Sequence, residues 1–211
     1  AKRITYLEWW FDEKSAMYDY KPNNSWYNAE FSPDERLRNL PLSLEIAESD
    51  RLICPTEWQK SQLPPLLKNH CQVIHDGVNI KRFHPADDKD SECELITYGT
   101  RGMEAMRGFP EFIEEADQIL ECHTNVFIEI AGQDRICYGG NAPEGFCSFG
   151  DWAKAKLKKW IDSSRVRFIG SLEYDDYRKW LQKSMIHVHL TRPFITSWSL
   201  IEAMASGCCI I

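Results

Sequence analysis

The sequence has no uninterrupted apolar run near the roughly 18 residues that a membrane-spanning helix needs, so we expect no transmembrane segment. It also has no excess of basic residues. The formal net charge is −7, which argues against a nucleic-acid partner, because such proteins carry a basic face. The first residues, AKRITYLEWWFDEK, become acidic before a long apolar core develops, unlike a signal peptide. These absences predict a cytoplasmic protein.

Metal-ligand and redox spacings are missing as well. None of the eight cysteines forms a CxxC pair or combines with histidine at a ligand spacing. Several lie in or beside apolar runs, where free thiols behave as small hydrophobic groups. No GxGxxG motif follows a strand, which disfavours a dinucleotide-binding Rossmann domain. We therefore expect a protein with reduced cysteines. With 43% hydrophobic and 27% charged residues, the composition is that of an ordinary globular protein.

The first part of the chain is irregular and rich in aromatic residues, which we interpret as core or interdomain packing. Within it, SPDERLRNLPLSLEIAESD predicts a helix that Ser32 caps and that Pro41 kinks or breaks. This helix has an apolar stripe of Leu37, Leu40, Leu44 and Ala47. RLICP then predicts a short buried strand, PTEWQKSQLPPLL a helix that the proline pair ends or bends, and CQVIHDGVN another strand.

From Glu94 onward, strands alternate with helices. The predicted strands are ELITYG, NVFIEIAG, RVRFIG, MIHVHL and CCII, and the predicted helices are FPEFIEEADQILECH, DWAKAKLKKWID, EYDDYRKWLQKS and SWSLIEAMASG. Strands alternating with helices of ten or more residues predict βαβ units in a parallel sheet. The expected fold class is α/β, with a doubly wound Rossmann-like sheet that binds ligands at the carboxyl ends of its strands.

The stretch ITYGTRGMEAMRGF places two arginines on a turn between a predicted strand and a predicted helix. Arg101 and Arg107 are each followed by glycine, and Gly99 ends the strand. The guanidinium group is a fork of donors suited to phosphate oxygens, and glycine lets the backbone approach a ligand closely. The turn is therefore a candidate diphosphate site. The alternative is a solvated loop with exposed arginines.

A second candidate site lies in LTRPFITSWSLIEAMASG, where a loop leads into a helix. Thr196 or Ser197 can cap this helix, and the free amides of its first turn can bind an anion. The candidate ligand-binding residues there are Ser197, Trp198, Ser199 and Leu200. Glu202 lies one turn further on, where its carboxylate can reach ribose hydroxyls. The same Ser–Glu spacing also fits a capping box, so both interpretations stay open.

Taken together, these motifs resemble one protein family. Residues 51 to 211 look like the donor half of a retaining glycosyltransferase with the GT-B fold, of the large group-1 (family 4) class. ICPTEWQKSQLP resembles the end of the N-terminal domain of that family, and VIHDGVNIKRFHP resembles the hinge. YGTRGMEAMRGFPEF resembles the diphosphate motif, with Arg101 as its arginine and Arg107 in place of its lysine. RVRFIGSLEYDDY resembles the segment that holds the base, near Leu172, and SWSLIEAMASG the helix whose glutamate, here Glu202, binds the ribose.

The resemblance implies a domain order and a reaction. Residues 1–78 would be the last portion of the acceptor-side domain with the hinge, and 79–211 a nucleotide-sugar-binding domain truncated at its end. A sugar would pass from a UDP- or GDP-linked donor to a hydroxyl of a glycan, lipid or protein, with its configuration retained. No cofactor and no metal are implied, because Arg101, Arg107 and the helix N-terminus would stabilise the leaving diphosphate, and Glu202 would position the nucleotide.

One departure from the family supports an alternative function. The family carries two glutamates eight positions apart in the last motif, and Phe194 occupies the first of these positions. Recognition of the donor sugar would then rely on other groups, or the chain would be a non-catalytic nucleotide-sugar-binding or assembly module.

The chain ends in GCCII, which resembles the start of a strand, so we expect a fragment with an unpaired sheet edge that favours self-association. The lysines of KAKLKKW predict a solvated helix face or a peripheral contact with the inner face of the membrane.

Overall fold

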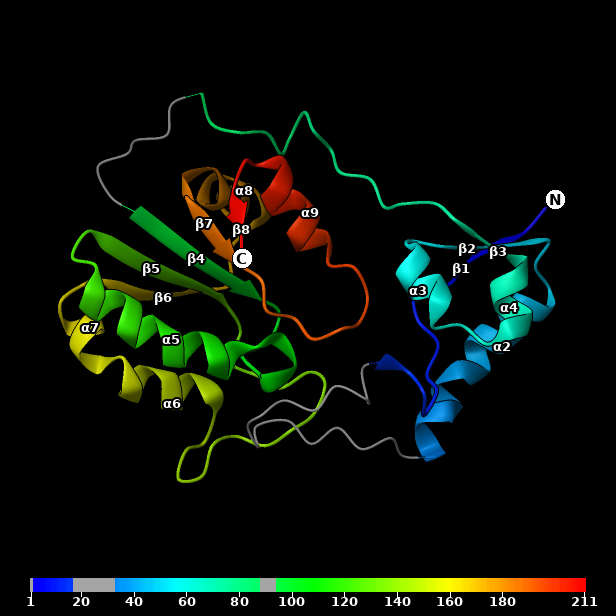
Figure 1. Ribbon diagram of the computed structural model, residues 1–211, viewed down its shortest axis with the longest axis horizontal. Coiled ribbons are helices and arrows are strands. Elements are labelled where there is room, and N and C mark those ends of the chain that lie inside the picture. Colours follow the sequence, from blue (N-terminus) through cyan, green and yellow to red (C-terminus); the bar gives the residue numbers. More distant parts are fainter. Residues whose placement is uncertain (1, 17–32, 88–93) are drawn as a thin grey trace. The chain divides into compact units, whose positions relative to one another are not determined.

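The computed structural model describes residues 2–16, 33–87 and 94–211 (Figure 1). The contacts within it divide the described residues into two units. Unit 1 comprises the described residues up to Gly77 together with Pro193–Ser197. Unit 2 comprises the described residues of Val78–Arg192 together with Trp198–Ile211. The main boundary between the two units thus lies after Gly77, whereas the predicted first domain ends at residue 78.

Unit 1 is built on a three-stranded parallel sheet in the order β1-β2-β3. Its elements are β1 (Ile4–Tyr6), the 3-10 helix η1 (Pro33–Asn39), α2 (Leu40–Ala47), β2 (Arg51–Cys54), α3 (Glu57–Ser61), α4 (Pro65–His70) and β3 (Cys71–Val73). The buried side chains of its core come from the strands, from the residue after β1 and from the turn after α3: Leu7, Leu52, Cys54, Leu63 and Cys71. The predicted strands around residues 51 and 71 are confirmed, whereas β1 was not predicted.

The predicted helix of residues 32–50 needs two corrections. It is divided at Asn39 into η1 and α2, because Pro41 fits only the first turn of an α-helix. The predicted apolar stripe does not face the core: Leu37, Leu40 and Leu44 are 58%, 59% and 72% exposed. Leu42 and Ile46 pack on the core instead. The expected cap, Ser32, and most of the aromatic cluster lie outside the described residues.

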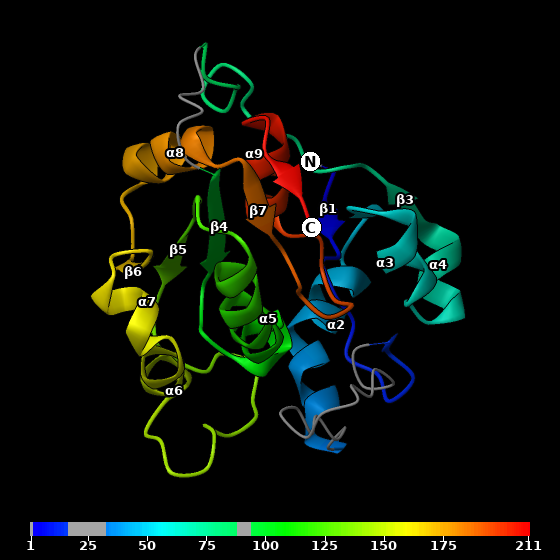
Figure 2. The same ribbon diagram turned by 60° about the vertical axis from the view of Figure 1, so that its left-hand side comes forward.

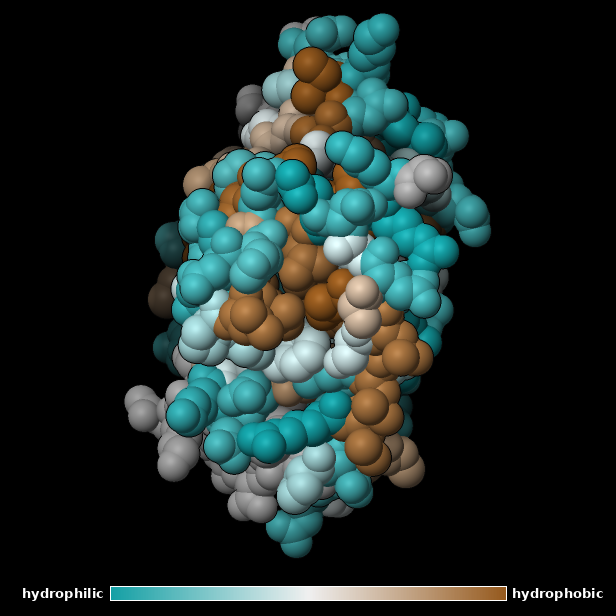
Figure 3. All heavy atoms as spheres, turned by 90° about the vertical axis from the view of Figure 1, so that its right-hand side faces the viewer, coloured by the Kyte–Doolittle hydropathy of each residue, from teal (hydrophilic) through white to brown (hydrophobic). Residues whose placement is uncertain are grey.

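The proline pair also acts differently from the simplest expectation. It ends α3, as predicted, and then begins a second helix, α4, with Pro65 in its first turn. Figure 3 shows that hydrophobic side chains reach the surface on the face that it draws. Among the large hydrophobic residues of unit 1, the exposed ones outside α2 include Ile4, Trp58, Leu66 and Ile74. Exposed apolar side chains of this kind are common on protein surfaces.

Unit 2 is a five-stranded parallel sheet in the order β6-β5-β4-β7-β8. Its strands are β4 (Glu94–Thr100), β5 (Val126–Gly132), β6 (Val166–Gly170), β7 (Ile186–Val188) and β8 (Cys209–Ile210). Its helices are η2 (Ala105–Arg107), α5 (Phe109–Cys122), α6 (Phe149–Lys156), α7 (Lys158–Asp162), α8 (Tyr174–Lys183) and α9 (Trp198–Ala205). Figures 1 and 2 show α5, α6 and α7 on one side of the sheet and α8 and α9 on the other.

The sequence explains why this sheet is covered on both faces. The middle strands β4 and β5 are nearly continuous apolar runs, which is typical of parallel strands between two layers of helices. The helix α5 buries one face, with Phe109, Phe112, Ile113, Ala116 and Leu120 at helical spacing. The predicted α/β class and parallel sheet are confirmed, and all the strands and helices predicted after Glu94 are present. One predicted helix is divided, because α6 and α7 meet at Leu157.

No helix among the described residues combines the length and the apolar character that crossing a membrane requires. The seven described cysteines are free thiols.

Candidate functional site

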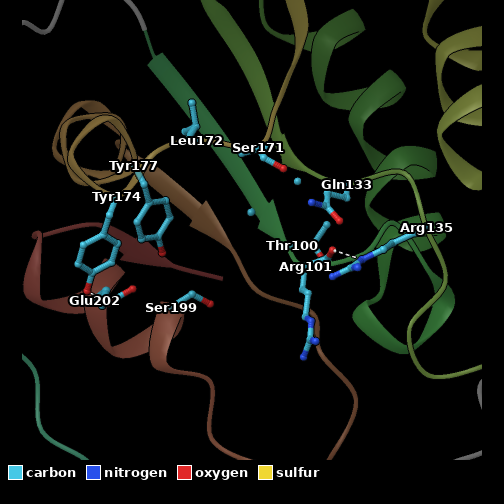
Figure 4. Close-up of a pocket in the computed structure, with 13 residues that line it drawn as sticks. Thr100, Arg101, Gln133, Arg135, Ser171, Leu172, Tyr174, Tyr177, Ser199 and Glu202 are labelled. Carbon is cyan, nitrogen blue, oxygen red and sulfur yellow. Dashed lines mark hydrogen bonds between the residues drawn. The ribbon is translucent and has the colours of Figure 1, made fainter.

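A pocket of about 410 Å³ lies in unit 2 at the carboxyl ends of β4, β5 and β6 (Figure 4). The start of α8 and the first two turns of α9 complete its wall. Its lining residues are Gly99, Thr100, Arg101, Ala131, Gly132, Gln133, Arg135, Ser171, Leu172, Tyr174, Tyr177, Ser199 and Glu202. This is the position at which doubly wound sheets bind ligands, as the sequence predicted for this region.

The floor of the pocket is made by two neighbouring strand ends. Gly99 and Thr100 of β4 pair with Ala131 and Gly132 of β5. Gly132 has a φ of +133°, and a Cβ there would overlap the carbonyl oxygen of Thr100. A larger residue cannot be placed at this strand end without moving the strand beside it, so glycine keeps the floor open.

One side of the pocket carries aromatic rings and a carboxylate. In Figure 4, Tyr174 and Tyr177 of α8 lie side by side next to Glu202 of α9. The Tyr174 hydroxyl donates a hydrogen bond of 2.6 Å to Oε1 of Glu202. This bond, with a smaller contribution from burial, raises the pKa of Tyr174, which therefore keeps its proton and stays a donor. Leu172 lies above them, just after the end of β6, so this side offers an apolar wall beside a hydrogen-bond acceptor.

The other side of the pocket is basic. Arg101 is exposed, and Arg135 comes from the Gly-rich loop that follows β5. The Nε atom of Arg135 donates to the carbonyl oxygen of Arg101 at 3.4 Å, which holds the two arginine segments together. Thr100 donates to the carbonyl oxygen of Gly102 at 2.7 Å and so closes the turn that presents Arg101. Two guanidinium groups at one end of a pocket form a site suited to phosphate oxygens.

Arg107 has a different environment from Arg101. It is half-buried and is not among the residues that line the pocket. Its guanidinium group lies 5.1 Å from the centre of the Tyr138 ring, and Nη1 donates to the Thr191 hydroxyl at 3.4 Å. Its Nε atom is buried without a hydrogen-bond partner among the described residues. These contacts connect η2 with two loops, so Arg107 has a structural role whether or not it binds phosphate.

A buried carboxylate lies between the two arginines in sequence. Glu104 is fully buried, and its Oε2 accepts hydrogen bonds from the backbone amides of Cys137 and Tyr138, at 2.7 and 2.8 Å. Burial raises the pKa of Glu104, and these two amides and the charges of both arginines act in the opposite direction. Glu104 therefore fastens the Gly-rich loop to the turn that carries Arg101 and Arg107.

The structure brings together part of the predicted site. Five of the nine predicted residues line the pocket: Gly99, Arg101, Leu172, Ser199 and Glu202. Arg107 and Leu200 do not line it, and neither does Trp198, which begins α9 and is 63% exposed. Ser197 belongs by its contacts to unit 1. The roles of all nine residues stay predictions.

Sequence reasoning missed several lining residues: Thr100, Gln133, Arg135, Ser171, Tyr174 and Tyr177. Except for Tyr177, which lies inside α8, each lies at the end of a strand or within four residues of it. The rule that ligands bind at strand ends therefore points to their segments, although it does not select the side chains. Tyr174 and Tyr177 also belong to the segment RVRFIGSLEYDDY, which resembles the base-binding segment of the family.

Phe194 and the two strand histidines also have defined environments. Phe194 is buried and packs edge-on against Trp9 within unit 1, with 4.8 Å between ring centres. His187 is fully buried and hydrogen-bonded through Nδ1 to the Thr97 hydroxyl, and burial lowers its pKa to about 4. Burial likewise lowers the pKa of His189 to about 4. Both histidines are thus neutral at ordinary pH.

Among residues 2–16, 33–87 and 94–211, no three His, Cys, Asp or Glu side chains gather as metal ligands would. The expectation that the reaction requires no metal stays a prediction.

Comparisons with known proteins give one family match and several similar structures. A family model described as Glycosyl transferase family 4 group matches residues 1–83. No curated protein matches the chain. The family match covers the segment in which the sequence suggested the end of an N-terminal domain and the hinge.

Solved structures extend the likeness to the rest of the chain. The C-terminal domain of LpcC, a group 1 glycosyl transferase family protein from Francisella tularensis, has a TM-score of 0.52 at 22% identity, over 64% of this chain and 69% of that domain. HepE from Anabaena, in complex with UDP and glucose, has a TM-score of 0.64 at 15% identity, over 99% of this chain. The sucrose-phosphate synthase of Thermosynechococcus elongatus has a TM-score of 0.63 at 14% identity, over 98% of this chain. The chain spans 52% of HepE and 49% of the synthase.

These matches confirm the resemblance found in the sequence in two respects. Residues 1–83 match the family-4 glycosyltransferases, and the fold is that of GT-B glycosyltransferases. The class of protein that the sequence predicted, a glycosyltransferase, is therefore the class that the comparisons support.

Proposed function

We propose that unit 2 binds a nucleoside diphosphate sugar and that the chain forms the donor-binding part of a retaining glycosyltransferase. The observation that carries this proposal is one pocket, at the carboxyl ends of parallel strands, with Arg101 at one side and Glu202 at the other. A nucleoside diphosphate has the complementary arrangement, with an anionic end and a hydroxyl-bearing ribose. The complex of the structurally similar HepE with UDP and glucose supports the same choice of ligand.

The lining residues suggest how the donor is held. The diphosphate lies toward Arg101 and Arg135, whose charge-assisted hydrogen bonds are among the stronger ones in proteins. The ribose hydroxyls donate to Glu202, and the base lies against the apolar wall near Leu172. Ser199 in the first turn of α9 adds a polar group near the centre of the pocket.

Charge stabilisation then accounts for the catalytic part of the proposal. When the bond between sugar and diphosphate breaks, negative charge develops on the leaving diphosphate. Arginines that already face this position stabilise that charge without having to reorganise, and enzymes commonly owe most of their rate enhancement to stabilisation of this kind. The acceptor is a hydroxyl of a glycan, lipid or protein. The protein acts in the cytoplasm, with peripheral contact with the inner face of the membrane where the acceptor is a lipid.

A non-catalytic nucleotide-sugar-binding module is the second candidate. The identity of Phe194 favours it, because this position carries a glutamate in the family, whereas here a buried ring packs on Trp9. Such a module binds nucleotide sugars and never transfers them, even when it is extended to the length of the structural neighbours.

The test is a calorimetric titration against UDP, GDP, ADP, their sugar conjugates and the corresponding nucleosides. We expect one nucleoside diphosphate to bind and its nucleoside to bind much more weakly. Incubation with the labelled sugar conjugate and mixed acceptors then separates the two candidates. Transfer by a version of the protein extended at both ends would support the enzyme, and binding without transfer would support the module. Absence of binding to every compound would contradict both.

A further inference from the structure

Tyr174 lies where three features of unit 2 meet. Its hydroxyl donates to Glu202, as described above. Its ring lies under the guanidinium group of Arg82, with 4.1 Å from the guanidinium carbon to the ring centre. Its edge contacts Phe83, with 5.4 Å between ring centres. The side chain is nevertheless 48% exposed, so packing alone does not explain these contacts.

Arg82 and Phe83 belong to the segment that enters unit 2. Phe83 is fully buried in a core cluster with Trp180, Leu181 and Ala203, and this fixes the segment to the sheet. Arg82 also forms an ion pair of 2.7 Å with Asp175, the residue next to Tyr174. A cation over one face of the ring and a buried ring at its edge hold the phenol in one orientation.

This fixed phenol leaves acceptor sites on Glu202 available. Each carboxylate oxygen can accept two hydrogen bonds, so the bond from Tyr174 uses one acceptor position of Glu202 and leaves others. Tyr177 also faces this carboxylate, because its pKa is raised mainly by burial and further by the charge of Glu202. A glutamate side chain on a helix surface otherwise samples several rotamers, and a ligand must then oppose the entropy of ordering it. A carboxylate that is already oriented avoids this cost.

We infer that Tyr174 is a positioning residue, which holds the Glu202 carboxylate in the orientation that accepts the ribose hydroxyls of the bound nucleotide, and that Arg82 in turn holds Tyr174. This inference rests on the proposed function. It makes the pair Tyr174–Glu202 responsible for the preference for ribose over deoxyribose. It also ties that preference to the segment that enters unit 2.

The sharpest variant is Tyr174→Phe, because it removes the hydroxyl and keeps the ring under Arg82. The matched control is Tyr6→Phe in unit 1, which removes a tyrosine–carboxylate hydrogen bond of similar length, 2.8 Å to Asp76. Both variants and the parent are titrated with UDP and GDP and with their 2′-deoxy counterparts. The melting temperature of each protein is measured in parallel.

We expect Tyr174→Phe to bind the ribonucleotide about three- to tenfold more weakly, which is the range for one ordinary hydrogen bond, because Tyr174 acts on the ligand only through the orientation of Glu202. The 2′-deoxynucleotide should lose about twofold or less, so the ratio of the two affinities falls. The control should leave that ratio unchanged. Arg82→Ala, which keeps the phenol but releases its ring, should reproduce part of the fall.

The outcomes separate this inference from the function on which it rests. A parent protein that binds no nucleotide contradicts the proposed function, and the inference with it. A parent that binds nucleotides, together with a Tyr174→Phe variant of unchanged affinity ratio, overturns only the inference. Tighter binding by Tyr174→Phe also overturns it, because the hydroxyl would then compete with the ribose for Glu202. A lower melting temperature with an unchanged ratio assigns Tyr174 a merely structural part.

Discussion

The two ends of the pocket are built in opposite ways. At the end proposed for the ribose, Glu202 is held by a tyrosine whose ring is itself fixed by Arg82 and Phe83. At the phosphate end, Arg101 is exposed, and its own turn is fastened from behind by Glu104 and by the Gly-rich loop. One end orders the side chain that binds, and the other orders the backbone from which a long, exposed side chain extends.

This difference matches what each end would recognise in the proposed complex. Ribose hydroxyls are neutral and directional, so their acceptor gains from a fixed orientation. Phosphate oxygens carry several equivalent acceptor sites and a large charge, so a long arginine on a firm base can bind them in more than one geometry. The comparison predicts that substitutions of the arginine at the phosphate end mainly change the affinity for the nucleotide. Substitutions of the residues that support its turn should mainly change the stability of the fold.

The largest expected effect is at Arg101. Arg101→Ala should weaken binding of the nucleoside diphosphate by about 1.5–3 kcal/mol, because it removes charge-assisted hydrogen bonds to phosphate. Binding of the nucleoside without phosphates should not change. Titration calorimetry measures both. Arg178→Ala is a suitable control, since Arg178 pairs with Gln182 on α8 and does not line the pocket. Equal diphosphate affinity for Arg101→Ala and this control would remove the basis for a phosphate end.

The next effect is at Glu202. Glu202→Gln should weaken nucleotide binding by about 1–2 kcal/mol, because a neutral amide accepts hydrogen bonds more weakly than a carboxylate. The thermal stability should be nearly unchanged if Glu202 serves the ligand. The capping-box interpretation does not hold, because α9 begins at Trp198 and Glu202 is its fifth residue. If Glu202 instead serves the fold through its bond with Tyr174, the loss appears in the melting curve, with about 1 kcal/mol or less and with binding preserved. A titration and a melting curve on the same variant distinguish the two.

Arg107 tests whether the two arginines of the motif are equivalent. Since Arg107 packs on Tyr138 and does not line the pocket, Arg107→Ala should lower the free energy of unfolding by about 1 kcal/mol. Its effect on diphosphate affinity should be smaller than that of Arg101→Ala. Urea unfolding and the same titration measure these two quantities. A loss of affinity as large as that of Arg101→Ala, with stability unchanged, would show that Arg107 turns toward the ligand when it binds.

The sequence predicted unit 2 far better than unit 1, for physical reasons. Strands such as ELITYG and NVFIEIAG are buried on both faces, so their apolar runs are unambiguous. The segment from Leu37 to Ile46 contains two interleaved sets of apolar residues, and the 3-10 turn before Leu40 changes which set faces the core. The strand β1 has three residues, too few for a periodic signal.

The residues of the site were likewise predicted only in part. Arg101 and Glu202 could be predicted because they follow a strand and begin a helix in recognisable motifs. Arg135 could not, because it lies in a Gly-rich loop where no periodicity fixes the direction of a side chain. The role inferred for Tyr174 depends on its hydrogen bond to Glu202, 28 residues away in the sequence, which only the folded sheet creates.

The smallest expected effect concerns the support behind the phosphate end. The pKa of Glu104 is raised by burial, so in the folded state this carboxyl binds its proton more tightly than in the unfolded state. Its contribution to stability is therefore fully present at low pH and is lost as the pH rises through the raised pKa. Relative to Glu104→Gln, which cannot ionise, the parent should lose stability as the pH rises from about 4.5, the ordinary carboxyl value, toward neutrality. Urea unfolding of both proteins at a series of pH values measures this difference, and titrations common to both cancel. A difference that is constant across the series, or one that grows in favour of the parent, would mean that the amides of Cys137 and Tyr138 outweigh burial, and that the carboxylate itself holds the loop.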